Sequence, residues 1–337
     1  MGVQTRAPCY PLHPSVRDRL HPDYVAFYNK HLLNQHPAHF LPLSVSRAKG
    51  NNIPCNGDPL PVGEILDRKI SRRETSGPDI AIRCFIPQGQ PPNCGWPVVL
   101  YYHGGGWVFG DLDSENNICT HICNRARAVV ITTDYRLAPE APWPAAIHDS
   151  WEAFLWATSD GKSILDLDPG KIAIGGSSAG SNIAAVVVQN ASIERCVNLR
   201  HQFLVVPVTD NTALPCSNPT WKTFEYTAAL PAKKMLWYRN HYLPDPASWS
   251  HREASPLLAP DAIFQRLPPA NIIVGEVDIL RHEGEEYAKK LRKNGVPVEL
   301  TLMQGMPHPF LAMDAVLEAG KQAIALTCDG LIQAFGN

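Results

Sequence analysis

The feature that most limits what this chain can fold into is a regular alternation of apolar strand-like runs and helical patterns after residue 80. Strand patterns are continuous apolar runs or alternate in polarity, whereas helical patterns repeat apolar residues at spacings of three and four. Strands are predicted at 80–87, 97–103, 128–135, 171–176, 201–208, 270–278 and 296–303, and helices at 144–159, 179–190, 283–295 and 317–335. This alternation predicts an α/β fold whose mostly parallel sheet is flanked by helices.

Two segments depart from the alternation. The first sixty residues are rich in Pro, His and Asn, with one helical stretch at 22–33, and read as an appendage to the core. Residues 211–260 lie between two core strands and are dense in Pro, Trp and Tyr. An insertion of this size usually forms a lid or one wall of a pocket, and a plain surface loop is the alternative.

Composition excludes several classes of protein. Thirty basic residues against 32 acidic ones give a net charge of −2, which suggests no nucleic-acid or anionic-membrane partner. The sequence shows no apolar run long enough to span a membrane or to act as a signal, and Arg6 stands where myristoylation needs Ser or Thr. Nine scattered cysteines, an odd number, favour a reducing, cytoplasmic setting. Cys119 and Cys123 lack a partner pair, so no metal site is predicted.

The stretch IAIGGSSAGSNIAA (172–185) runs from a predicted strand into a predicted helix and contains a candidate nucleophile. Gly176, Ser178 and Gly180 fit the G-x-S-x-G pattern of a nucleophile elbow, in the strand-to-helix context that the pattern requires. Small residues on both sides permit the tight turn. Ser177 stands one place too early, so Ser178 is the predicted nucleophile.

A second motif, HGGGWVFG (103–110), follows the predicted strand at 97–103. After His103 and Gly104, the backbone N–H groups of Gly105 and Gly106 are predicted oxyanion donors, joined by Ala179 behind the nucleophile. Each donor could contribute roughly 3 kcal/mol to transition-state stabilisation. A plain glycine turn is the alternative reading.

An acid and a histidine must follow such a serine, each after a strand. Asp278 ends the strand at 270–278, and His308 follows the strand at 296–303. The prolines on either side of His308 restrict its loop. Glu276 and Glu283 are rival acids, and His282 would be a rival base only if it lay outside the following helix.

These motifs, with DYRLAPE (134–140), DILRHEG (278–284) and PHPF (307–310), resemble the hormone-sensitive-lipase-like branch of α/β-hydrolase carboxylesterases over residues 80–330. The resemblance implies Ser178 as nucleophile, Asp278 as acid and His308 as base. It also implies an α/β-hydrolase core at 61–210 and 261–337, capped by residues 1–60 and 211–260 within a single domain. Aromatic residues of the motif and cap are then candidate pocket residues, with core packing as the alternative: Trp107, Trp221, Phe224 and Tyr226.

The elbow departs from the usual G-D-S-A-G-G of that branch, because Ser177 replaces the Asp and Ser181 replaces the last Gly. Neither change removes a catalytic group. Both are similar to variants in fungal esterases of secondary metabolism, such as the versiconal hemiacetal acetate esterase type.

The predicted reaction is hydrolysis of short-acyl esters of a small molecule through an acyl-enzyme, without metal or organic cofactor. A bulky Trp behind the glycines and an aromatic cap suggest a closed pocket. Acyl transfer or condensation with the same triad is the main alternative, followed by formamidase activity and a non-catalytic small-molecule-binding protein. The oligomeric state is not defined by the sequence, and a homodimer is compatible with it.

Overall fold

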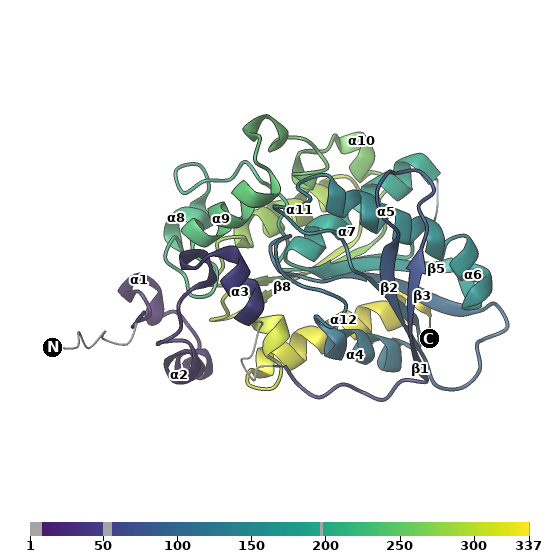
Figure 1. Cartoon of the computed structure of the whole chain (residues 1–337), viewed down its shortest axis with the longest axis horizontal. Coiled ribbons are helices and arrows are strands. Elements are labelled where there is room, and N and C mark those ends of the chain that lie inside the picture. The colour runs from purple at the N-terminus through teal and green to yellow at the C-terminus, as the bar shows by residue number, and fades with distance from the viewer. Residues whose placement is uncertain (1–8, 50–55, 196–197, 337) are drawn as a thin grey trace.

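Eight strands form the central sheet in the computed structural model, which describes residues 9–49, 56–195 and 198–336. The strand order is β1-β2-β4-β3-β5-β6-β7-β8 (Figure 1), and β2 runs antiparallel to both of its neighbours while all later pairs are parallel. The strands are β1 (Glu64–Ile70), β2 (Ile80–Ile86), β3 (Trp96–Tyr102), β4 (Val129–Thr133), β5 (Leu167–Ser177), β6 (His201–Val205), β7 (Ala270–Gly275) and β8 (Val298–Met303). The predicted α/β fold class is confirmed.

Burial explains which strands the sequence revealed. Every residue of β3 and β7 is buried, as expected for strands covered on both faces, and such strands read as continuous apolar runs. The edge strand β1 pairs only with β2 and buries only Ile70 fully. Its sequence therefore lacks an apolar run, and the strand was not predicted.

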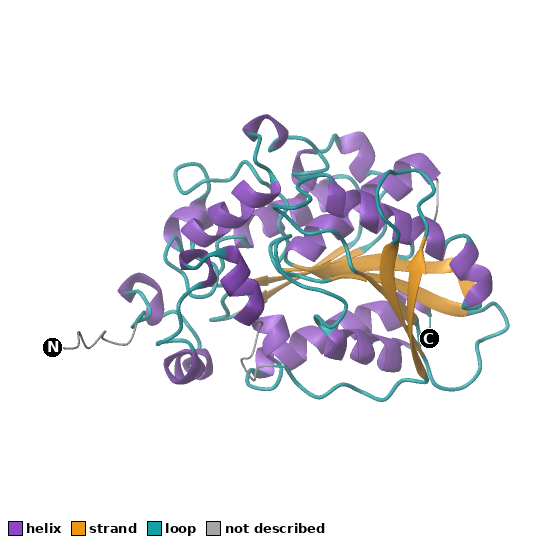
Figure 2. Ribbon diagram, in the orientation of Figure 1, coloured by secondary structure: helices purple, strands orange, loops and turns teal. Residues whose placement is uncertain are grey.

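Helices cover both faces of the sheet, and Figure 2 shows them as two layers with the strands between. One layer contains α5 (Ala145–Ala157), α7 (Ala179–Asn190) and α11 (Arg281–Lys293), and the other contains α4 (Asn116–Ala126) and α12 (Glu318–Phe335). The short helices are α1 (Pro14–Arg17), α2 (Pro22–His31), η1 (Ala38–Phe40), α3 (Leu43–Lys49), α6 (Asp160–Ile164), η2 (Ala191–Arg195), α8 (Pro219–Thr223), α9 (Ala232–Tyr242), η3 (Pro246–Ser248), η4 (Pro256–Leu258), α10 (Asp261–Phe264) and η5 (Phe310–Met313). No helix among the described residues is long and apolar enough to cross a membrane.

The N-terminal segment and the 211–260 insertion gather at one end of the molecule, where α1, α2, α3, α8 and α9 lie (Figure 1). Arg47 of α3 donates from Nε to the carbonyl oxygen of Val108 at 3.1 Å, and it pairs with Glu140 at 2.8 Å. The backbone N–H of His21 donates to the carbonyl oxygen of Gly305 at 2.9 Å. The N-terminal segment thus contacts the loops after both β3 and β8, although residues 1–8 and 50–55 of the predicted cap lie outside the described residues.

Candidate active site

Ser178 occupies a sharp turn between β5, which ends at Ser177, and α7, which begins at Ala179. Its backbone has a positive φ of 53° with ψ −118°, a conformation that costs a non-glycine residue energy and is common at functional sites. A Cβ at Gly176 or Gly180 would overlap the carbonyl oxygen of Tyr102, so only glycine fits at those two positions. Ser178 is partly exposed, while its neighbours Ser177 and Ala179 are buried.

A continuous hydrogen-bonded chain joins Ser178, His308 and Asp278. The distance from Ser178 Oγ to His308 Nε2 is 2.7 Å, and the distance from His308 Nδ1 to Asp278 Oδ2 is also 2.7 Å. Asp278 follows β7 and His308 follows β8, so the carboxyl ends of neighbouring strands bring the three side chains together. With the Nδ1 proton donated to the carboxylate, the Nε2 lone pair faces the serine hydroxyl. The arrangement can therefore accept the Ser178 proton.

The rival residues are engaged elsewhere. His282 lies within α11, which begins at Arg281, so the condition under which it would be a rival base is not met. Glu276 accepts the backbone N–H of Gly305 at 2.8 Å. Glu283 accepts the backbone N–H of Thr209 at 2.8 Å, and burial raises the pKa of its carboxyl to about 8.

The glycine loop after β3 is anchored by His103. Its imidazole is buried and stacked on the Tyr135 ring, with centroids 4.3 Å apart, and the Tyr135 hydroxyl donates to the His103 carbonyl oxygen at 2.8 Å. Burial lowers the pKa of His103, so the ring is neutral. Gly105 and Gly106 have φ values of 119° and 63°, which favour glycine. Within the described part of the chain, their N–H groups and that of Ala179 have no protein acceptor.

Glu115 is a feature of the site that the sequence analysis missed. One carboxylate accepts hydrogen bonds from the Tyr101 hydroxyl at 2.8 Å, the Gly104 N–H at 3.2 Å and the Ser177 hydroxyl at 2.7 Å. It thereby ties β3, the glycine loop and the elbow together. The available signal was Ser177 itself, since a hydroxyl at the position of the usual Asp leaves room for a carboxylate from another segment.

Ser181, the other departure from the family motif, has a packing role. Its hydroxyl donates to the Gly176 carbonyl oxygen at 2.6 Å and accepts the Val205 N–H at 3.0 Å. This links the first turn of α7 to β5 and β6 behind the elbow.

The four predicted pocket aromatics occupy different environments. Trp107 is fully buried and stacks on Tyr242, with ring centroids 4.3 Å apart. Trp221 and Phe224 are buried in the insertion, whereas Tyr226 is 53% exposed and stacks on His13 of the N-terminal segment. Their part in substrate binding stays a prediction.

Tyr238 of α9 was not among the predicted pocket residues, but it lies against the glycine loop. Its ring occupies the space that a Cβ on Gly106 would need. The insertion therefore contacts the candidate oxyanion donors directly.

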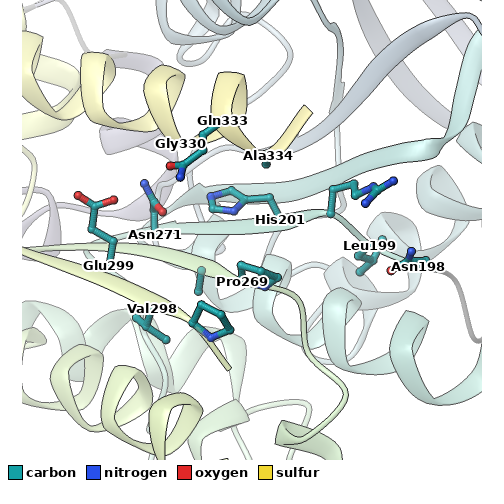
Figure 3. A pocket seen from close by; sticks show the side chains of 13 residues that line it. Asn198, Leu199, His201, Pro269, Asn271, Val298, Glu299, Gly330, Gln333 and Ala334 are labelled. Carbon is teal, nitrogen blue, oxygen red and sulfur yellow. The ribbon is translucent and has the colours of Figure 1, made fainter. Parts of the chain in front are cut away.

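A cavity of about 610 Å³ lies away from the triad, at the amino ends of β6, β7 and β8 and beside α12 (Figure 3). Its lining includes His201, Asn271 and Glu299. The Nε2 atom of His201 is buried and has no hydrogen-bond partner among the described residues. None of the predicted site residues lines this cavity.

Fold and site together define a class of protein. The family model described as "alpha/beta hydrolase fold" matches residues 99–312, and the chain belongs to this family, as the motifs predicted. The chain is 44% identical over 341 residues to an AB hydrolase superfamily protein of Schizosaccharomyces pombe, covering 99% of this chain and 100% of that protein.

Other relatives carry enzyme names. The chain is 34% identical to the carboxylesterase NlhH of Mycobacterium tuberculosis over 298 residues, covering 87% of this chain and 91% of NlhH. A solved esterase structure from Pyrobaculum calidifontis superimposes with a TM-score of 0.82 at 30% identity, covering 93% of this chain and 98% of that one.

Proposed function

We propose that this chain is a serine carboxylesterase that hydrolyses short-acyl esters of a small molecule through an acyl-enzyme on Ser178. The observation that carries the proposal is the unbroken chain of two 2.7 Å hydrogen bonds from Ser178 through His308 to Asp278. The relatives named as carboxylesterases support the same activity.

The reaction begins when Ser178 Oγ attacks the ester carbonyl carbon and its proton passes to His308 Nε2. Asp278 holds the imidazole in orientation and stabilises its positive charge. The carbonyl oxygen becomes an oxyanion, for which the N–H groups of Gly105, Gly106 and Ala179 are the proposed donors. Collapse breaks the bond to the alcohol oxygen, which takes the proton from His308.

The second half of the reaction repeats these roles. His308 removes a proton from water, and the resulting nucleophile attacks the acyl carbon on Ser178. The second oxyanion collapses, the bond to Ser178 Oγ breaks, and His308 returns the proton to that oxygen. Every atom needed is supplied by the three side chains, the backbone, the ester and water.

The contact between the insertion and the glycine loop supports a preference for short acyl chains. Tyr238 lies against Gly106, and Trp107, the residue after Gly106, is fully buried. A cytoplasmic setting and a homodimer stay predictions. The first is supported by seven cysteines in the described segments that are all free thiols: Cys9, Cys84, Cys94, Cys119, Cys123, Cys216 and Cys328.

A panel of activated esters from acetate to dodecanoate, run with wild type and Ser178→Ala, tests the proposal. We expect the highest kcat/KM on the shortest acyl chains and a loss of about 10⁴-fold or more in the variant. A fluorophosphonate probe labels Ser178 in wild type and leaves the variant unlabelled. Full turnover by a folded Ser178→Ala protein would refute the assignment, and a maximum at long chains would refute the acyl preference.

A further inference from the structure

Lys234 stands on the face of α9 that is turned toward the glycine loop. It precedes Tyr238 by four residues, so the two side chains lie on the same face of the helix. Its Nζ is 5.8 Å from the centroid of the Tyr238 ring, and that ring fills the space beside Gly106. Lys234 is therefore one side chain away from the candidate oxyanion donors.

Lys234 also contacts the segment that packs beside Asp278, the acid of the proposed triad. Its Nζ donates to the carbonyl oxygen of Ala229 at 2.9 Å. Two residues before Ala229, the hydroxyl of Thr227 donates to the carbonyl oxygen of Val277, the neighbour of Asp278. The ammonium group is thus held between the segment that contacts the glycine loop and the segment that contacts the Asp278 loop.

This ammonium group has no anionic partner. Among the described residues no carboxylate lies within ion-pair distance of it, and burial lowers the pKa of Lys234 to about 8. By contrast, Lys290 and Lys293 both reach Asp261, at 3.7 and 2.9 Å. Lys234 is partly buried, and moving a cation even partly out of water without pairing it is costly; one carbonyl oxygen also satisfies only one of its three N–H donors.

The charged and titratable neighbours of Lys234 add no negative charge. His39 of η1 has a buried Nδ1 without a hydrogen-bond partner among the described residues, and burial together with the positive charges of Lys234 and Lys233 lowers its pKa to about 4. Burial also raises the pKa of Tyr238, which keeps its hydroxyl neutral. Around Lys234 the described residues therefore offer a second cation, the exposed Lys233, and neutral polar groups, but no carboxylate.

We propose that the substrate carries a carboxylate a few atoms from the scissile ester carbonyl and that Lys234 binds this carboxylate. The inference rests on the proposed esterase function and deepens it. An anionic group at this position supplies the counter-charge that the protein lacks, while the ester carbonyl reaches Ser178. The carboxylate belongs either to the acyl chain or to the alcohol, and the two sources are separated by experiment.

Matched ester pairs test the proposal. For the acyl side, monoethyl glutarate is compared with ethyl pentanoate, and for the alcohol side, 3-acetoxypropanoate is compared with propyl acetate. We expect the charged member of one pair to have the higher kcat/KM in wild type. In Lys234→Met that ratio falls by about 10- to 100-fold because the cation is lost, while hydrolysis of the neutral ester persists.

Lys233→Met is the matched control. Lys233 is exposed, and its Nζ lies over the Phe40 ring at 5.2 Å, so the same change of charge is made one residue away. We expect the wild-type ratio in this variant and a partial recovery of the ratio in Lys234→Arg. The wild-type preference should also decline above about pH 8, where Lys234 loses its proton, and show no such decline in Lys234→Met.

The outcomes separate the two proposals. An unchanged ratio in Lys234→Met, or a wild-type preference for both neutral esters, overturns the role of Lys234 and leaves the esterase function standing. Absence of hydrolysis of every ester in wild type overturns the esterase function itself.

Discussion

The two ends of the parallel sheet differ in whether their buried polar side chains have hydrogen-bond partners. At the carboxyl ends of β5, β7 and β8, Ser178, His308 and Asp278 satisfy one another. At the amino ends of β6 and β7, the cavity of about 610 Å³ is lined by His201, whose Nε2 has no partner among the described residues (Figure 3). A roomy cavity alone is thus a poor guide to chemistry, and a chain of short, oriented hydrogen bonds is a better one.

The largest expected effect comes from breaking that chain at its acid. Asp278→Asn keeps the shape of the side chain but favours the wrong imidazole tautomer, so kcat should fall by roughly 10⁴-fold. Stopped assays on an activated acetate ester measure the change. Glu276→Gln alters the rival acid, which accepts the Gly305 N–H at 2.8 Å and pairs with Arg19 at 3.6 Å, and should cost less than about 10-fold. Equal losses in the two variants would contradict the assignment of Asp278.

The next largest effect is expected at the contact between the glycine loop and α9 of the insertion. Gly106→Ala places a methyl group against the Tyr238 ring on a backbone with φ 63°, which should displace the oxyanion donors and lower kcat by about 10²- to 10³-fold. Gly295→Ala controls for the backbone alone, because Gly295 has φ 81° and open space around it. Steady-state kinetics of both variants should show a loss only in the first. A wild-type kcat in Gly106→Ala would contradict a role of the glycine loop in the mechanism.

A smaller effect is expected at Glu115. Gln in its place retains one acceptor oxygen for three donors, so the glycine loop or the elbow loses a hydrogen bond and kcat should fall by about 10-fold. Ser177→Ala should cost a similar amount, and the double variant should show less than the sum of the two losses. Glu115→Gln combined with Ser177→Asp returns a carboxylate to the elbow and should recover activity. Strict additivity would show that the two residues act separately.

The smallest effect on activity is expected at the opposite end of the sheet. Burial lowers the pKa of His201 from 6.5 to about 4, so the folded protein holds it neutral and the unfolded chain binds the extra proton first. The contribution of His201 to the free energy of unfolding is fully present above pH 6.5. It is lost as the pH falls toward 4, which lowers that free energy by about 3 kcal/mol. Urea titrations from pH 4 to 7 should show a flatter dependence in His201→Gln. A reduced kcat of His201→Gln at neutral pH would contradict this expectation and show that the cavity around His201 affects the candidate active site.

The same contrast explains how far the sequence could predict the molecule. Ser178, Asp278 and His308 could be predicted as candidates because each follows a strand within a local sequence pattern, and the structure joins their side chains by hydrogen bonds. The role of Glu115 depends on Tyr101, Gly104 and Ser177 meeting in space, which no local pattern encodes.

The N-terminal segment and the insertion were the parts least open to prediction. Both were recognised by composition, but the selected aromatics range from the fully buried Trp107 to the exposed Tyr226. Tyr238 and Lys234 gain their significance only from the way α9 lies over the glycine loop. Contacts between segments far apart in sequence decide such placements, and a pattern within one segment does not contain them.

The contacts of the N-terminal segment have a consequence for the order of assembly. Its partners, the carbonyl oxygens of Val108 and Gly305, are supplied by residues far along the chain. During synthesis α1, α2 and α3 leave the ribosome long before Gly305 exists, and contacts of such wide sequence separation form late. These helices are therefore made well before their partner at Gly305, and the loop carrying His308 gains this support only after Gly305 itself has been made.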